Sequence, residues 1–327
     1  MERRLENSCI ARPPQVSWRT LLAPAVYDDG RSASLNKSEC SFGTGAKIYA
    51  RDMLYEKWQL VTENIEGQLT VASDKLPALS AFAHAFALAL GRGQYLSGLW
   101  RGNLIWHLLW MVYHDAVKSK SRAPSWSWAA WKGTIEHSRK FDKALLQPQC
   151  VVKEAHAPAV GRNPFGTVDA ATSWTILTRC KLVKAELHPT SREFDDLVLH
   201  PAELCIRKGN RSIVVGHGMI DGIPTSGLKK NGTFKPEDLG SLPHNGDVLA
   251  LLLVGNIPHV EHEPGDSAGF KESETAVYSQ GLLVTPCASM ADLQGLRAFE
   301  RIGMFRSDIR DAIGLWDSCL EYVLKLT

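Results

Sequence analysis

The stretch RAPSWSWAAW, residues 122–131, is the point where the apolar pattern of the chain changes its period. Trp126 and Trp128 alternate with small residues, and this spacing of two is typical of a β-strand. Pro124 restricts the backbone to an extended conformation at the entry to the run. We therefore expect a strand to begin here and a β-rich region to come after it.

The same stretch closes a tryptophan-rich region, which runs from Trp58 to Trp131 and holds seven of the ten tryptophans of the chain. A tryptophan buries a large apolar area and needs only one partner for its indole N–H. The alternative is an aromatic site that binds a ligand or a cation. Because buried aromatic residues are common, we expect this region to be a packed structural core and not a catalytic centre.

Residues 51–121, before the change of period, are predicted to form a helical segment, because apolar residues recur at spacings of three and four. The predicted helices cover residues 49–61, 74–90 and 96–116. In the second of these, the negative charge of Asp74 is stabilised by the positive end of the helix dipole, and Pro77 lies in the first turn, where proline is tolerated. Gly91 or Gly93 is expected to end it.

Residues 122–327 are predicted to form an antiparallel β-barrel or sandwich that ends in a helix, which makes the chain an α+β protein. Strand-like runs recur between turn-rich segments and cover residues 150–155, 174–188, 197–208, 212–220, 248–254, 281–286 and 298–305. Apolar residues from Ile309 to Val323 return to a helical spacing. Residues 1–50 lack sustained periodicity and are expected to be irregular or partly disordered.

The composition is that of a folded globular protein, with 44% hydrophobic and 22% charged residues. The formal net charge of +2 provides no field of one sign that would hold nucleic acid. The seven cysteines contain no C-x-x-C pair, which favours reduced thiols in a cytoplasmic protein. The longest apolar runs are shorter than the ~20 residues that cross a bilayer. We expect no nucleic-acid partner and no membrane span.

Four short blocks occur in a fixed order: DKLPALS at 74–80, YLSGLW at 95–100, LLW at 108–110 and RAPSWSWA at 122–129. They resemble the region that follows the HET domain in fungal heterokaryon-incompatibility proteins. The positions that carry the resemblance are Asp74, Leu76, Pro77, Tyr95, Gly98, Leu99, Trp100, Trp110, Arg122, Pro124, Trp126 and Trp128. A weaker resemblance continues through the β-rich region to residue 306.

The resemblance implies a recognition or regulatory region of a protein that distinguishes self from non-self and signals cell death, working with a protein partner. The pattern departs from the family at Ser97, where Ala is usual, and at Ala81, where Gly is usual. The motifs of the HET domain itself, the part related to TIR domains, are not found in residues 1–57. Signalling or NAD cleavage of the TIR type is therefore not carried over to any residue here, and the region is expected to be non-enzymatic.

Two segments of the β-rich region carry groups that could act on a small ligand. His217 and Asp221 lie among glycines, but nucleophilic catalysis also needs a Ser or Cys placed beside the histidine. His259 and His262 are three residues apart, whereas a zinc-binding helix needs histidines at i and i+4. We expect no catalytic residue, metal or cofactor. The alternative function is a small-ligand-binding or hydrolytic β domain with its site at one of these segments.

Arg122 is a single charge at the boundary between the helical segment and the first expected strand. Its guanidinium would tie the two together by pairing with a carboxylate or with carbonyls at the end of a helix. The alternative is that Arg122 is simply exposed to solvent.

Overall fold

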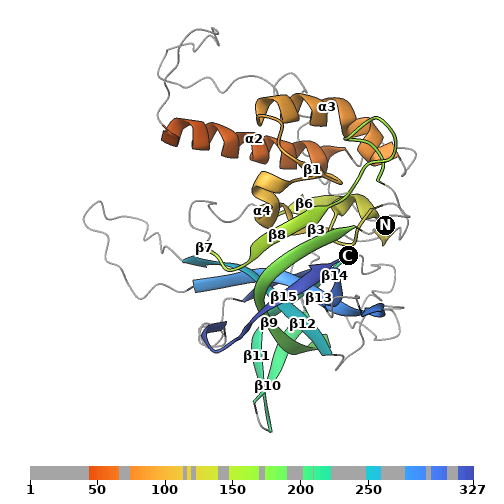
Figure 1. Cartoon of the computed structure of the whole chain (residues 1–327). Helices are drawn as coiled ribbons and strands as arrows, with labels where there is room; N and C mark the ends of the chain where they lie inside the picture. The colour runs from red at the N-terminus through yellow and green to blue at the C-terminus, as the bar shows by residue number, and fades with distance from the viewer. Residues whose placement is uncertain are drawn as a thin grey trace, which may run out of the picture. The chain divides into compact units, whose positions relative to one another are not determined.

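The computed structural model describes residues 44–65, 74–112, 116–118, 123–138, 147–168, 174–189, 202–208, 210–221, 248–258, 277–291, 296–307 and 316–327 (Figure 1). The chain forms two compact units, residues 1–57 and residues 58–327. The second unit contains the tryptophan-rich region and the strands.

Two helices match helices predicted from the sequence: α2, Thr44–Asn64, and α3, Lys75–Ala89. α2 begins inside the stretch 1–50 that was expected to be irregular, and residues 1–43 lie outside the described residues. α3 follows Asp74 and ends before Gly91, whose φ of +70° is a conformation that glycine adopts without strain. Within the described ranges, no helix combines the length and the apolar character needed to span a bilayer.

The predicted helix over residues 96–116 is wrong. The chain instead forms a hairpin, a short helical turn and a strand: β1 Tyr95–Leu96, β2 Leu99–Trp100, η3 Arg101–Asn103, α4 Leu104–His107 and β3 Trp110–Val112. The reason is the two-residue turn Ser97-Gly98, in which both residues have positive φ angles, +49° and +96°. A tight hairpin loop of this kind suits the twist of the strands, so the dipeptide overrides the helical spacing around it.

The predicted strand at residues 125–130 is also wrong, because the chain forms a 3-10 helix, η4 Trp128–Ala130, at this point. The Ser127 hydroxyl accepts a hydrogen bond from the Ala129 N–H at 3.1 Å and so caps the turn. Short strands surround it, with β4 Val117–Lys118 paired to β5 Trp131–Lys132 and β3 paired to β6 Ile135–His137. Residues 123–131 are all buried, so their alternation of large and small residues does not separate a buried face from an exposed one.

All seven strands predicted beyond residue 131 are present. They are β8 Val151–His156, β9 Thr175–Pro189, β10 Ala202–Lys208, β11 Arg211–Ile220, β12 Val248–Pro258, β13 Val277–Ala291 and β14 Arg297–Ser307. With β7 Gln147–Pro148 and β15 Glu321–Leu326 they form one nine-stranded sheet. Its pairings are antiparallel except for β14 with β15, which are parallel.

The strand order is β11-β10-β9-β15-β14-β13-β12-β7, and β8 pairs with β9. β9 also pairs with β12, and β11 with β14, so the pairings lead from β9 through β10, β11, β14, β13 and β12 back to β9. The long, curved β9 makes this arrangement possible because its two halves have different neighbours (Figure 1). The chain therefore has a large, mostly antiparallel sheet, as expected, although not a clear barrel.

The predicted C-terminal helix is wrong for its last part, where β15 lies between β9 and β14. Residues 308–315 lie outside the described residues, and within residues 316–327 only Trp316 and Asp317 are helical. Leu320 and Val323, expected on the buried helix face, are 71% and 44% exposed, whereas Leu324 is 1% exposed. The change from an exposed to a buried side chain between adjacent residues is that of a strand.

Candidate functional site

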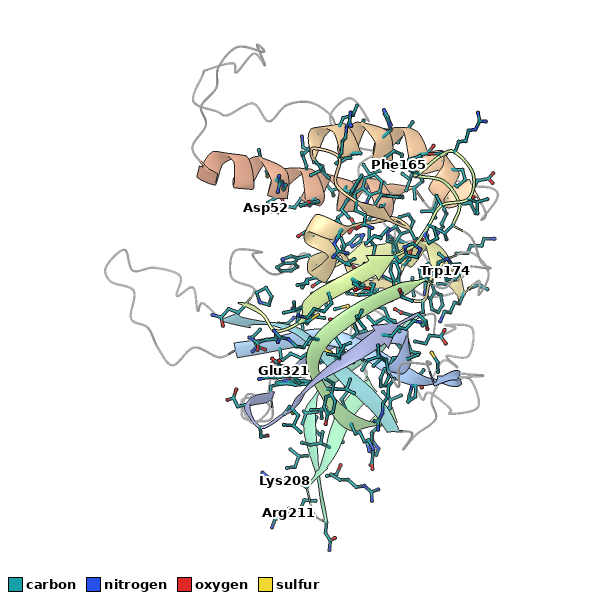
Figure 2. The ribbon with its side chains drawn as sticks, in the orientation of Figure 1. Asp52, Phe165, Trp174, Lys208, Arg211 and Glu321 are labelled. Atoms are coloured by element: carbon teal, nitrogen blue, oxygen red, sulfur yellow. The ribbon has the colours of Figure 1, made fainter. Side chains whose placement is uncertain are left out.

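Trp100 and Trp128, from two of the sequence blocks, form a buried cluster with Trp58 at the β1–β2 hairpin. The Gly98 carbonyl accepts hydrogen bonds from the indole N–H groups of Trp58, at 2.8 Å, and Trp128, at 3.2 Å. The ring of Trp58 makes edge-to-face contacts with Trp100, at 5.5 Å between ring centroids, and with Phe86, at 5.3 Å. All seven tryptophans from residue 58 to residue 131 are buried, which confirms that this region is a packed core. Figure 2 shows many side chains close together beside α3.

The last block contacts both the hairpin and the first block. The Ser127 hydroxyl donates to the Ser97 carbonyl at 2.5 Å, across the hairpin turn. Lys75, from the start of α3, is buried; its ammonium donates to the Trp131 carbonyl and lies 5.7 Å from the centroid of the Trp128 ring. Hydrogen bonds that end on backbone carbonyls therefore hold the last block on the hairpin and tie the start of α3 to Trp131, two residues after that block.

Arg301 of β14 connects the remaining block, at Trp110, to the sheet. Its guanidinium donates to the Asp221 carboxylate, with Nη1 and Oδ2 2.5 Å apart, and to the Trp110 carbonyl. The guanidinium carbon lies 3.3 Å from the centroid of the Trp110 ring, in the geometry of a cation–π contact. Trp110 in turn donates its indole N–H to the Trp126 carbonyl at 3.1 Å. We call Arg301, Asp221, Trp110 and Trp126 the arginine joint.

Ser125 provides a second connection at the same place. Its hydroxyl accepts a hydrogen bond from the Arg301 backbone N–H at 3.0 Å and donates to the Thr327 carbonyl. Thr327 follows β15 and donates its own backbone N–H to the Phe299 carbonyl of β14 at 3.0 Å. The RAPSWSWA block is thus fastened to two neighbouring strands of the sheet.

The charges of the arginine joint are fully withdrawn from solvent, with Arg301 0% and Asp221 1% exposed. Burial raises the pKa of the Asp221 carboxyl to about 6, against the lowering effect of Arg301 and Lys118. Burial lowers the pKa of the Arg301 guanidinium to about 10, against the raising effect of Asp221. Both groups are charged at pH 7, so each depends on the other for its counter-charge.

The structure does not bring the predicted pair His217 and Asp221 together. They lie four residues apart along β11 and its end, a separation of about 13 Å in a strand. His217 is in register with Arg306, whereas Asp221 is bonded to Arg301. His259 and His262 lie outside the described residues. Among the residues that the structure describes, no group of three His, Cys, Asp or Glu side chains is arranged to hold a metal ion.

A serine motif follows His259 and His262 in the sequence. Residues 265–269 read GDSAG, which matches the G-x-S-x-G pattern of a nucleophile elbow with Ser267 at its centre. The segment lies outside the described residues, between β12 and β13, which are antiparallel neighbours.

The burial of the remaining positions that carry the resemblance is as follows. Leu76, Gly98, Leu99 and Pro124 are buried, Asp74 and Pro77 are exposed at the start of α3, and Arg122 lies outside the described residues. Arg301 makes a contact of the kind expected of Arg122, because it pairs with a carboxylate and contacts a second part of the chain. The sequence signal for Arg301 is its place inside the strand-like run 298–305, where a buried charge would need a partner.

Two buried histidines near the cluster also have structural roles that sequence reasoning did not identify. The Nδ1 atom of His107 accepts the Trp100 backbone N–H at 3.1 Å. The Nε2 atom of His137 is 2.9 Å from the Thr62 hydroxyl, and the two imidazole rings are 6.4 Å apart. The two histidines are too far apart along the chain to form a local pattern from which the contact could be predicted.

No protein-family model, curated protein or solved structure matches this chain.

Proposed function

We propose that this chain is a non-enzymatic recognition and regulatory region of the heterokaryon-incompatibility type, acting in the cytoplasm through a protein partner. The observation that carries the proposal is the arginine joint. It connects the blocks that carry the resemblance to the sheet, through Arg301 on β14 and Asp221 at the end of β11. A regulatory region needs such a connection, because a partner bound on the sheet must alter another part of the molecule.

The chemistry of the blocks supports a structural role for them. Their hydroxyl and ammonium groups, on Ser127 and Lys75, donate to backbone carbonyls. A nucleophile that is activated for catalysis would instead be bonded to a general base. In this proposal the circuit of six paired strands is a closed barrel, the partner binds its outer surface, and the joint transmits the effect to the tryptophan cluster.

The experiment is to fuse the HET domain of a fungal incompatibility protein to the N-terminus of this chain and to express the fusion in a fungal host. Cell death is scored for the complete fusion, for a fusion without residues 134–327, and for Arg301→Met. The proposal predicts that the deletion and Arg301→Met change the cell-death response, while Arg297→Met, an exposed arginine on the same strand, leaves it unchanged. An unaltered response in the deletion variant would contradict the proposal.

The hydrolytic alternative is tested separately, by treating the chain with a fluorophosphonate probe that labels activated serines. The proposal predicts no labelling above that of the heat-denatured chain. Labelling that disappears in Ser267→Ala and persists in Ser226→Ala would contradict the proposal and assign the GDSAG segment a nucleophile.

A further inference from the structure

Two cysteines lie opposite each other on neighbouring strands of the sheet. β8 and β9 are antiparallel, and Val151 of β8 lies opposite Arg179 of β9. The same register, continued by one residue, places Cys150 opposite Cys180. Residues directly opposite each other on antiparallel strands point to the same face, with Cα atoms about 4.5–5.5 Å apart. We call Cys150 and Cys180 the cysteine pair.

Contacts of the cysteine pair show that both thiols lie on the buried face of β9. The Cys150 Sγ atom is 3.0 Å from the Thr178 hydroxyl. Thr178 and Cys180 are two residues apart on β9, so their side chains point to the same face. All three side chains are buried, and the two thiols are close enough to interact electrostatically. Both cysteines are free thiols.

The spacing of the cysteine pair suits a disulfide. A disulfide joins residues whose Cα atoms are about 4.4–6.8 Å apart and whose Cβ atoms are about 3.5–4.5 Å apart. Residues opposite each other on antiparallel strands already meet the first condition, and a closing movement of about 1 Å meets the second. β8 is able to make this movement, because among the described strands it pairs with β9 alone.

We propose that the cysteine pair is a redox site, at which an oxidant of the disulfide class, such as oxidised glutathione, produces a disulfide between β8 and the start of β9. The Cys150 thiolate attacks one sulfur of the oxidant and displaces the first thiolate. The Cys180 thiolate then attacks the Cys150 sulfur of this mixed disulfide and displaces the second. The two cysteines lose two protons and two electrons, and the oxidant becomes two thiols. The site is independent of the arginine joint and of the recognition function proposed above.

Burial sets the speed of this reaction. It raises the pKa of the Cys150 thiol, against the lowering effect of the hydrogen bond with Thr178. It also raises the pKa of the Cys180 thiol, and the neighbouring Cys150 raises it further. Only the thiolate attacks a disulfide, so the reaction is slow at neutral pH and becomes faster as the pH rises. The cysteine pair is therefore expected to respond to sustained oxidation and not to brief exposure.

The test is to incubate the full chain with excess oxidised glutathione, to block the remaining thiols with iodoacetamide in denaturant, and to digest it without reduction for mass spectrometry. A peptide that links Cys150 to Cys180, and that is lost on treatment with dithiothreitol, is the expected result. A matched sample oxidised in urea, where the strands are apart, is expected to give a mixture of linked cysteines. The same mixture from the folded chain, or Cys150 and Cys180 recovered on separate peptides, would overturn the proposal.

Thermal unfolding measures the effect of the disulfide on the fold. The bond closes a loop of about 30 residues, so oxidation is expected to raise the melting temperature by roughly 7–15 °C. Cys150→Ala and Cys180→Ala are each expected to lose this rise, whereas Cys287→Ala, at a half-buried cysteine of β13, keeps it. Equal rises in Cys150→Ala and Cys287→Ala would assign the effect to other cysteines and overturn the proposal. The linked peptide is measured in the unsubstituted chain, so the test does not depend on the folding of a variant.

Discussion

Replacing Arg301 by methionine tests the arginine joint most strongly. The substitution leaves the Asp221 carboxyl buried without its counter-charge and removes the cation above the Trp110 ring. Breaking a buried ion pair by removal of one partner costs about 3–5 kcal/mol. For a unit of this size, such a loss lowers the melting temperature by roughly 6–20 °C. Thermal unfolding followed by circular dichroism and by tryptophan fluorescence measures the change.

A double-mutant cycle separates the pair from its surroundings. Asp221→Leu alone leaves a buried guanidinium uncompensated, whereas the double variant Asp221→Leu with Arg301→Met replaces both charges by apolar groups. The double variant is therefore expected to be more stable than either single variant, and the coupling free energy must then exceed the smaller single cost, which is about 3 kcal/mol or more. Arg297→Met, at an exposed position of the same strand, is expected to change stability by less than about 0.5 kcal/mol. Additive single effects would refute the ion pair.

Three further predictions concern the turn, the carboxyl group and the last strand. Gly98→Ala should lower the urea midpoint of unfolding more than Gly161→Ala does. Both glycines have positive φ angles, but a Cβ atom at residue 98 would lie 2.8 Å from the Trp128 indole ring, whereas one at residue 161 would meet open space. Because the pKa of Asp221 is raised in the folded state, the folded state binds more protons than the unfolded state between about pH 4 and pH 6. The unfolding free energy is therefore expected to fall by roughly 3 kcal/mol as the pH rises through that range. Asp221→Asn should remove this fall from the unfolding free energy measured against pH. Leu324→Ala should cost about 2–5 kcal/mol and Val323→Ala less than about 1 kcal/mol in denaturant unfolding, since only the first side chain is buried in β15, and equal costs would contradict the strand.

The seven strands β8–β14 were predictable because their runs of strand-forming residues are separated by turn-rich segments. Those signals are local, and they correspond to the physical cause of strand formation. The pairing of β9 with four different strands was not predictable, because it depends on contacts between residues far apart in sequence. The sequence therefore indicated a large antiparallel sheet without determining how it closes.

Two of the wrong predictions have a common cause, because in each a turn outweighed the local spacing of apolar residues. The Ser97-Gly98 turn breaks the helical spacing of residues 96–116, and the Ser127 cap breaks the strand spacing of residues 125–130. At the candidate site, burial of the tryptophans could be predicted from their size and number. The arginine that connects the tryptophan cluster to the sheet could not be predicted, because Arg301 and Asp221 are 80 residues apart and share no local pattern.

Hydrogen–deuterium exchange in Asp221→Asn tests most directly whether the arginine joint couples the tryptophan cluster to the sheet. The variant weakens the Arg301 contact inside the sheet and changes no residue of the hairpin. We predict faster exchange than in the unsubstituted chain both at residues 298–306 of β14 and at residues 95–110, which contain the hairpin and Trp110. Faster exchange confined to β14, with residues 95–110 as protected as before, would contradict the coupling.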